Sequence, residues 1–179
     1  MKRCAWCNLN NEIYVNYHDK EWGVLNLDDA YLFEMLILEL FQAGLSFECV
    51  LNKREYFKEA YDNFDIRKII LYDENKINKL MNNKNIIRNK RKIEASINNA
   101  KIFKQISEEY KGFYNYLKTF TKGDVIYEND KTTSILSDNI SQDLQKRGMK
   151  FVGSTIIYSY LQAIGVINSH DDTCDYKNK

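Results

Sequence analysis

Apolar residues recur at spacings of three and four along most of this chain, and that periodicity is the strongest constraint on its fold. The clearest run follows Asp28 and Asp29, whose carboxylates favour a helix N-terminus. Gly44 marks a stop after it. Between them the apolar positions are Leu32, Phe33, Leu36, Ile37, Leu40 and Phe41. The pattern predicts an all-α protein.

The same spacing predicts further helices along the rest of the chain. We expect them at roughly 47–61, 66–71, 113–120, 137–146 and 151–166, and expect two or three short helices with asparagine-rich turns across 74–104. β-branched residues in 151–166 leave a strand as the alternative there. Residues 123–133 are predicted to form a loop, and the polar tail after residue 170 to be loosely held. Without repeats or long linkers, residues 1–179 are predicted to form a single domain, with two helical lobes.

Composition restricts the class of protein. The chain has 179 residues, of which 44% are apolar, enough for a real core. No apolar stretch approaches the roughly 20 residues needed to cross a bilayer, and no apolar secretory region follows the first residues. We therefore expect a cytoplasmic monomer with no membrane partner. The formal net charge is +1, so any nucleic-acid site must come from a local basic cluster.

Potential metal ligands gather near the two ends of the chain. They are Cys4, Cys7, His18, His170 and Cys174. His170 and Cys174 are spaced so that one turn can direct both side chains at one ion, and such N and S donors suit tetrahedral Zn²⁺. Two sets remain open, one completed by Cys4 and Cys7 and the other by Cys4 and His18. Alternatively, these are ordinary thiols and surface histidines.

A carboxylate lies within the most apolar helix. On a helix, Glu39 shares its face with Leu32, Met35 and Leu36. A buried carboxylate there is costly unless it is paired or functional. The alternative is a solvated helix edge, which is favoured by Asp28 on the same face.

Aromatic residues crowd the N-terminal segment, at Trp6, Tyr14, Tyr17 and Trp22. Individually they are typical of core packing. As a group beside a carboxylate, they could wall a slot for a planar base.

A basic stretch covers 84–104, with seven basic residues and only Glu94 as an acid. Its densest part, 88–92, follows the asparagine-rich turn at 82–85, where backbone amides and cations can meet phosphates together. The alternative is a solvated lysine-rich surface.

Together these motifs resemble the bacterial 3-methyladenine DNA glycosylase I family. The resemblance is collinear and covers almost the whole chain. It is carried by residues 3–6, 17–24, 32–35, 39–46, 51–54, 86–89, 146–153, 158–159, 162–165 and 168–170. It implies an all-helical helix-hairpin-helix fold with a structural zinc site tying the N- and C-terminal segments. It also implies that the protein hydrolyses the N-glycosidic bond of 3-methyladenine in double-stranded DNA, and that the free base leaves as product.

The resemblance assigns roles to particular residues. It implies Glu39 as the catalytic, base-reading residue. The implied zinc ligands are Cys4, His18, His170 and Cys174, without Cys7. The implied base-binding residues are Trp6, Tyr14, Tyr17 and Phe47. The implied DNA-binding residues are Leu45, which fills the gap left by the flipped nucleotide, and Arg88, Lys90, Arg91 and Lys92 in a hairpin at roughly 81–92.

Three positions depart from the family pattern. Phe47 stands where the family usually has tryptophan, which reduces the stacking area. Asn85 and Arg91 stand where the family commonly has glycine in the hairpin, so that close approach to phosphate is expected to change. Asparagine tolerates a left-handed backbone better than most residues do. A zinc-stapled DNA-binding module without catalysis is the alternative function, but it gives Glu39 and the aromatic slot no purpose.

Overall fold

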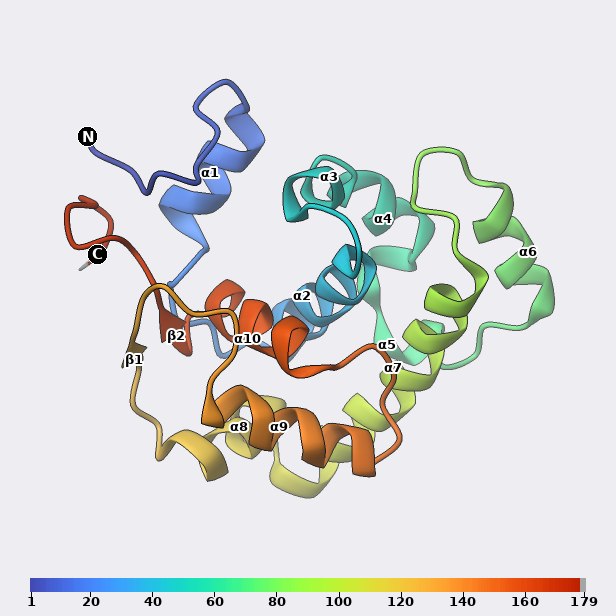
Figure 1. Ribbon diagram of the computed structural model, residues 1–179. Helices are drawn as coiled ribbons and strands as arrows, with labels where there is room; N and C mark the ends of the chain where they lie inside the picture. The colour runs from blue at the N-terminus through green and yellow to red at the C-terminus, as the bar shows by residue number, and fades with distance from the viewer. Residues whose placement is uncertain (178–179) are drawn as a thin grey trace.

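The computed structural model describes residues 1–177 as a mostly helical molecule with two very short strands (Figure 1). The helices are α1 (Glu12–Lys20), α2 (Asp29–Gln42), α3 (Phe47–Leu51), α4 (Arg54–Ala60), a 3₁₀ turn (Asp62–Phe64), α5 (Ile66–Ile69), α6 (Glu74–Asn82), α7 (Lys90–Tyr110), α8 (Phe113–Thr121), α9 (Ile135–Lys146) and α10 (Ser154–Ala163). The strands are β1 (Ile126–Tyr127) and β2 (Ile167–Asn168), which pair in parallel. Within residues 1–177, no helix is long and apolar enough to span a membrane.

Helix α2 forms the centre of the molecule and contacts α3, α7, α8 and α10 (Figure 1). The carboxylate of Asp28 accepts hydrogen bonds from the backbone N–H groups of Ala30 and Tyr31. Asp28 therefore caps the N-terminus of α2, as predicted. Every residue from Leu32 to Phe41 is buried except Glu34. Because apolar contacts surround the helix, burial rather than intrinsic propensity stabilises it.

The predicted helix at 47–61 is two helices, α3 and α4. Asn52 ends α3, and its backbone N–H donates to the carbonyls of Glu48 and Val50. The next residue, Lys53, begins α4 without a side-chain cap. The apolar spacing continues across this break, which is why the periodicity alone did not reveal it.

The prediction of short helices across 74–104 is wrong beyond the turn at 83–89, because α7 runs without interruption through the asparagines at its centre. Asn99 is buried, and its side chain exchanges two 2.8 Å hydrogen bonds with the backbone of Lys150. Asn98 donates to the carbonyl of Gly148. These asparagines bind the segment between α9 and α10 instead of breaking the helix.

The C-terminal region also differs from prediction. Helix α9 begins at Ile135 behind a capping box at Ser134, two residues earlier than expected. Helix α10 is confirmed as a helix but is shorter than predicted, and β1 lies inside the predicted loop at 123–133. The tail is not loose, because Cys174 and Tyr176 are buried and the backbone N–H of Asp175 donates to the carbonyl of Lys2.

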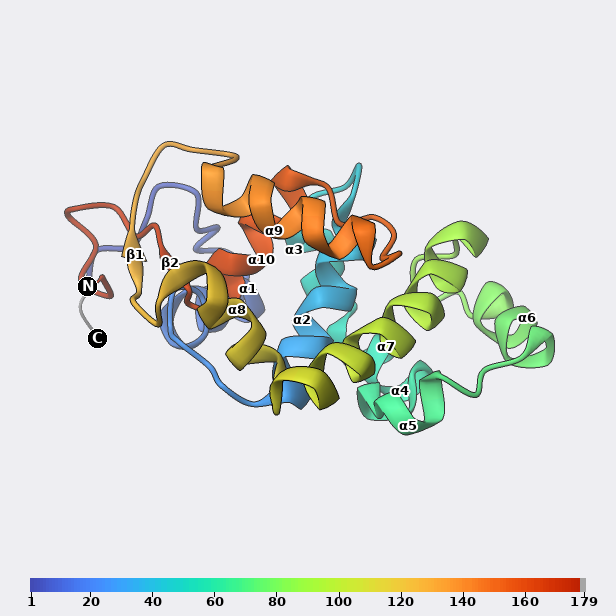
Figure 2. The same cartoon turned by 90° about the horizontal axis from the view of Figure 1, so that it is seen from below.

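The chain ends meet at one end of the molecule, and α6 lies at the opposite end in both views (Figures 1 and 2). Helix α7 runs from α6 back toward the centre (Figure 2). The turn between α6 and α7 is therefore remote from the termini.

Candidate functional site

A cavity of about 230 Å³ opens beside the last turns of α2. Its lining comes from the N-terminal segment, α1 and the segment after it, α2, α3 and α10. The lining residues are Trp6, Tyr14, Tyr17, Trp22, Glu39, Gln42, Phe47, Ser159 and Gln162. The structure thus brings together Glu39 and all four predicted base-binding aromatics.

The aromatic side chains pack on one another around this cavity. The ring centroids of Trp6 and Tyr14 lie 5.2 Å apart, and those of Tyr17 and Phe47 lie 5.0 Å apart. Tyr14 and Tyr17 are nearly parallel, with 10° between their planes. The wall is therefore a mutually braced set of rings, with π faces available to a planar or cationic ligand.

Glu39 is only 2% exposed, and its Oε2 atom has no hydrogen-bond partner among the described residues. Burial raises the pKa of this carboxyl well above its usual value. No cation pairs with Glu39 within residues 1–177. The alternative of a solvated helix edge is therefore wrong, and a polar ligand in the cavity would supply the missing partner.

Three cavity residues were not predicted as site residues, namely Gln42, Ser159 and Gln162, whereas Trp22 belongs to the aromatic group expected to wall a slot. Gln42 lies three residues after Glu39, on the same helix face. Its Oε1 atom is also buried without a partner among the described residues. Ser159 and Gln162 also lie three residues apart, on one face of α10. That face reaches the cavity because α10 packs against α2, a tertiary contact that sequence periodicity does not reveal.

A second cluster joins the two ends of the chain. It consists of Cys4, His18, His170 and Cys174, all buried, with ligand atoms within 4.8 Å of one another. Cys7 is not among these residues, so the structure favours the set that includes His18.

Hydrogen bonds orient both imidazoles of this cluster. Nδ1 of His18 lies 2.8 Å from Oδ1 of Asp19, which Arg3 holds through two further bonds. Nδ1 of His170 lies 3.0 Å from Oδ1 of Asn168. Both Nε2 atoms therefore face the cluster: that of His18 lies 3.2 Å from the backbone N–H of Cys4 and 3.6 Å from Sγ of Cys174, and that of His170 is buried without a partner among the described residues.

The ionisation states of the cluster fit a metal site. Burial lowers the pKa of His170 to about 4, which keeps its imidazole neutral as coordination requires. Burial raises the pKa of the Cys4 thiol to about 12, and a bound divalent cation would offset that effect. The donor set of two thiols and two imidazoles can therefore hold a metal ion.

The cluster of two cysteines and two histidines supports the cavity wall directly. The rings of Trp22 and His170 lie 4.6 Å apart, and those of Trp6 and His18 lie 5.2 Å apart. Trp6 and Trp22 in turn contact each other at 4.6 Å. The order of the cluster and the shape of the cavity are thus coupled.

The predicted DNA-binding residues do not share one environment. Leu45 is 45% exposed in the turn after α2. Arg88 and Arg91 are exposed, and neither has an ion-pair partner among the described residues. Lys90 is exposed but lies 3.4 Å from Glu74 and 3.7 Å from Glu94.

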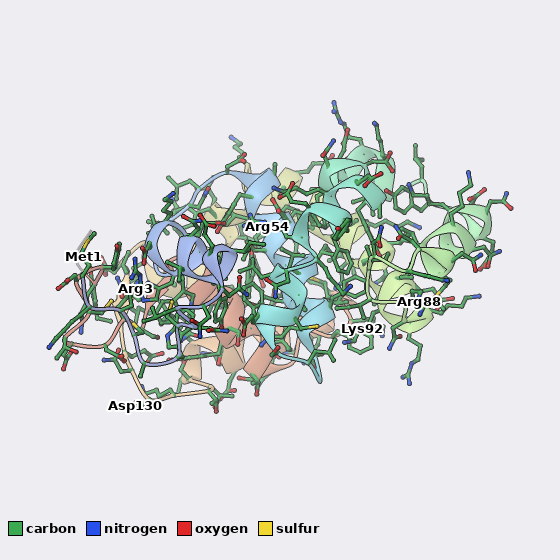
Figure 3. The ribbon with its side chains drawn as sticks, turned by 90° about the horizontal axis from the view of Figure 1, so that it is seen from above. Met1, Arg3, Arg54, Arg88, Lys92 and Asp130 are labelled. Carbon is green, nitrogen blue, oxygen red and sulfur yellow. The ribbon has the colours of Figure 1, made fainter. Side chains whose placement is uncertain are left out.

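Lys92 departs from the predicted phosphate contact. It is 6% exposed, and its Nζ atom donates to the backbone carbonyls of Phe41 and Ala43. Figure 3 shows it on the green ribbon of α7 where that ribbon approaches the cyan segment after α2, whereas Arg88 lies farther out.

The two hairpin departures do not strain the backbone. Neither Asn85 nor Arg91 has a positive φ, so no left-handed conformation at these positions requires glycine. The tolerance of asparagine for that conformation is not needed here.

Comparison with known proteins gives a consistent result along the whole chain. A family model described as methyladenine glycosylase matches residues 6–178. The chain is 39% identical to DNA-3-methyladenine glycosylase 1 of Escherichia coli, over 97% of this chain and 96% of that protein. A crystal structure of 3-methyladenine DNA glycosylase I matches with a TM-score of 0.92 at 37% identity, covering 97% of this chain and 98% of the other. A structure of Staphylococcus aureus 3-methyladenine DNA glycosylase I, concerned with its recognition of 3-methyladenine, matches with a TM-score of 0.94 at 31% identity, covering 100% and 98%. The chain therefore belongs to the methyladenine glycosylase family.

Proposed function

We propose that this protein is a DNA repair enzyme that hydrolyses the N-glycosidic bond of 3-methyladenine in alkylated DNA and leaves an abasic site. The observation that carries the proposal is the buried, unpaired Glu39 carboxyl in a cavity walled by aromatic rings. The family relationship supports the same reaction. A DNA-binding module without catalysis would leave this combination unexplained.

The cavity chemistry supports selection of an alkylated adenine. The methylated base carries positive charge, which favours the faces of Trp6, Tyr14, Tyr17 and Phe47. An ionised Glu39 would accept a hydrogen bond from the exocyclic amino group of adenine, whereas it would face a carbonyl in guanine. The wrong base would therefore leave a buried charge unpaired.

The cationic base is already a good leaving group, so the reaction needs little acid catalysis. Water is the proposed nucleophile. The enzyme is proposed to be monofunctional, and the engagement of Lys92 Nζ with two carbonyls supports that. Flipping the nucleotide costs a few kcal/mol, less for a weakly paired damaged base.

The direct test is the release of free bases from methylated duplex DNA, resolved by chromatography. We expect release of 3-methyladenine with little 7-methylguanine. Folded, metal-loaded protein that releases neither base would favour the non-catalytic module. Quenching of Trp6 or Trp22 fluorescence by free 3-methyladenine would separately test occupation of the cavity.

We further propose that the metal is Zn²⁺, held by Cys4, His18, His170 and Cys174. Four protein ligands leave no open position, which is typical of a structural site. When bound, the ion supplies a fixed link between the two ends of the chain. The residues themselves hold Trp6 and Trp22 in the cavity wall.

The arrangement of α6, the turn at 83–89 and α7 supports the helix-hairpin-helix assignment, although two short strands accompany the helices. One buried apolar cluster has members from Cys4 to Tyr176, which supports a single domain for residues 1–179. The protein is proposed to act as a monomer on double-stranded DNA.

Arg88 provides a test of the DNA-binding surface. Because its guanidinium is exposed and has no ion-pair partner among residues 1–177, we propose that it contacts a phosphate. Arg88→Met is expected to weaken binding to all duplexes similarly and to reduce the slope of log affinity against log salt by about one. Fluorescence anisotropy at several salt concentrations measures both quantities. Lys101→Met, which removes an exposed charge farther along α7, is the matched control, and an equal effect of both variants would contradict this role.

A further inference from the structure

The C-terminal end of α2 carries no basic residue of its own, yet a cation binds there. Helices end in carbonyls without intrahelical partners and with a partial negative charge. The Nζ atom of Lys92 lies 2.9 Å from the carbonyl oxygen of Phe41 and 2.5 Å from that of Ala43. The cation comes from the first turn of α7, 51 and 49 residues away in sequence.

No carboxylate pairs with Lys92 among the described residues. Burying an ammonium without a counter-charge is costly, and burial lowers the pKa of Lys92. A methionine would fill similar space without that cost. The position of the charge therefore suggests a role beyond packing.

The Lys92 side chain joins two parts of the proposed DNA surface. Lys92 lies in the first turn of α7, just after the turn at 83–89 and beside Arg91. Ala43 begins the exposed turn that carries Leu45. Glu39, the proposed base reader, lies in the last two turns of the same helix that Lys92 caps.

Little else fixes this exposed turn. Gly44 has a φ of +80°, and a Cβ atom built on it would meet nothing within 4 Å. The backbone N–H of Leu45 donates to the carbonyl of Gln42, and Ser46 caps α3. Lys92 is thus the long-range polar contact that holds the turn against α7.

We infer that Lys92 is a positioning residue whose ammonium fixes the end of α2, so that Leu45 enters the DNA stack when the hairpin binds phosphate. The inference rests on the proposed function. This role differs from a phosphate contact, because the Lys92 ammonium already donates to two backbone carbonyls inside the protein. It links binding of the DNA backbone to extrusion of the damaged nucleotide.

The test compares Lys92→Met, Leu45→Ala and the double variant, with Lys101→Met as control. Single-turnover excision at saturating protein is expected to fall roughly tenfold to a hundredfold in Lys92→Met, the range expected when hydrogen bonds to a buried charged group are lost. If Lys92 acts through Leu45, the double variant is expected to be no slower than the slower single variant. The salt slope of DNA binding is expected to match that of the wild type.

Two results would overturn the inference. One is a salt slope reduced as in Arg88→Met with an unchanged saturated rate, which identifies a phosphate contact. The other is a double variant whose loss is the product of the two single losses. Should Lys92→Met not fold, Lys92→Gln carries the same comparison, because its shorter side chain does not reach both carbonyls.

Amide hydrogen exchange provides a readout that is independent of catalysis. Faster exchange at Leu45 and Ser46 in Lys92→Met, with an unchanged rate in Lys101→Met, is expected even without substrate. Unchanged exchange at both amides counts against the inference. Failure of the wild type to release base would instead count against the proposed function, so the two failures are distinguishable.

Discussion

Glu39→Gln is expected to slow excision of 3-methyladenine by about a hundredfold or more, because the variant loses the buried carboxylate that is proposed to accept a hydrogen bond from the base. Binding to undamaged duplex is expected to change little, since the exposed cations Arg88 and Arg91 lie outside the cavity that holds Glu39. Preference for 3-methyladenine over 7-methylguanine is expected to weaken. Base release under single-turnover conditions, with Glu59→Gln on the surface of α4 as control, measures the effect. Equal excision by Glu39→Gln and wild type would remove Glu39 from the mechanism.

Ionisation of Glu39 in the wild type is expected to lower the stability of the fold and to raise the activity as pH increases. Because the folded-state pKa of Glu39 lies above its usual 4.5, the folded protein binds a proton more tightly than the unfolded chain. The wild type therefore loses stability as pH rises from that usual value through the folded pKa. Over the same window kcat/KM is expected to rise, since the ionised form of Glu39 is the one proposed to bind the base.

Calorimetry at pH 5 and pH 8 checks the stability effect. At pH 8, Glu39→Gln is expected to melt roughly 3 °C above the wild type, equivalent to about 1 kcal/mol in a chain of this size. At pH 5 the gap is expected to narrow. A gap that is constant across pH would show that ionisation of Glu39 is not its source.

Cys174→Ser is the second substitution with a large expected effect. Loss of this proposed structural metal ligand is expected to cost about 4 kcal/mol or more, which corresponds to a fall in Tm of roughly 10 °C or more. Binding of free 3-methyladenine is also expected to weaken, because Trp6 and Trp22 pack on the histidines of the cluster. Zinc content by mass spectrometry, Tm and tryptophan quenching are the three measurements.

Two other cysteines provide matched controls for that experiment. Cys7 is buried close by but lies outside the cluster, and Cys49 is exposed. Cys7→Ser and Cys49→Ser are expected to retain one zinc per chain. Loss of zinc from Cys7→Ser with retention in a His18→Ala variant would reverse the ligand assignment.

Local signals in the sequence predicted much of the fold. The Asp28 cap, the apolar spacing of α2 and the asparagine-rich turn before α7 each depend on residues a few positions apart. The wrong predictions concern contacts between residues that lie far apart in the sequence. The asparagines within α7 are satisfied by a segment about 50 residues away, and the tail is buried by the N-terminal segment. Periodicity contains no information about such contacts.

In the candidate site, too, residues marked by local sequence were predicted and those placed by long-range contacts were not. Glu39 stood out because a carboxylate is unusual among apolar residues, but only the structure excludes a solvated edge. The sequence placed Lys92 in a basic run, where each charge is most simply read as exposed. Its burial depends on the end of α2, which lies about 50 residues earlier. Ser159 and Gln162 were missed because α10 reaches the cavity only through packing.

The meeting of the chain ends also sets an order of events during synthesis. His18 leaves the ribosome early, but Cys174, which lies 3.6 Å from it in the folded protein, follows 156 residues later. Until His170 is made, Trp22 lacks its contact with that imidazole, and His18, on which Trp6 packs, lacks Cys174 beside it. A chain that has not reached Cys174 would therefore carry the exposed cations proposed to bind DNA before its cavity wall is complete. Completion of the cavity wall therefore depends on synthesis through His170 and Cys174, after the residues proposed to bind DNA have already been made.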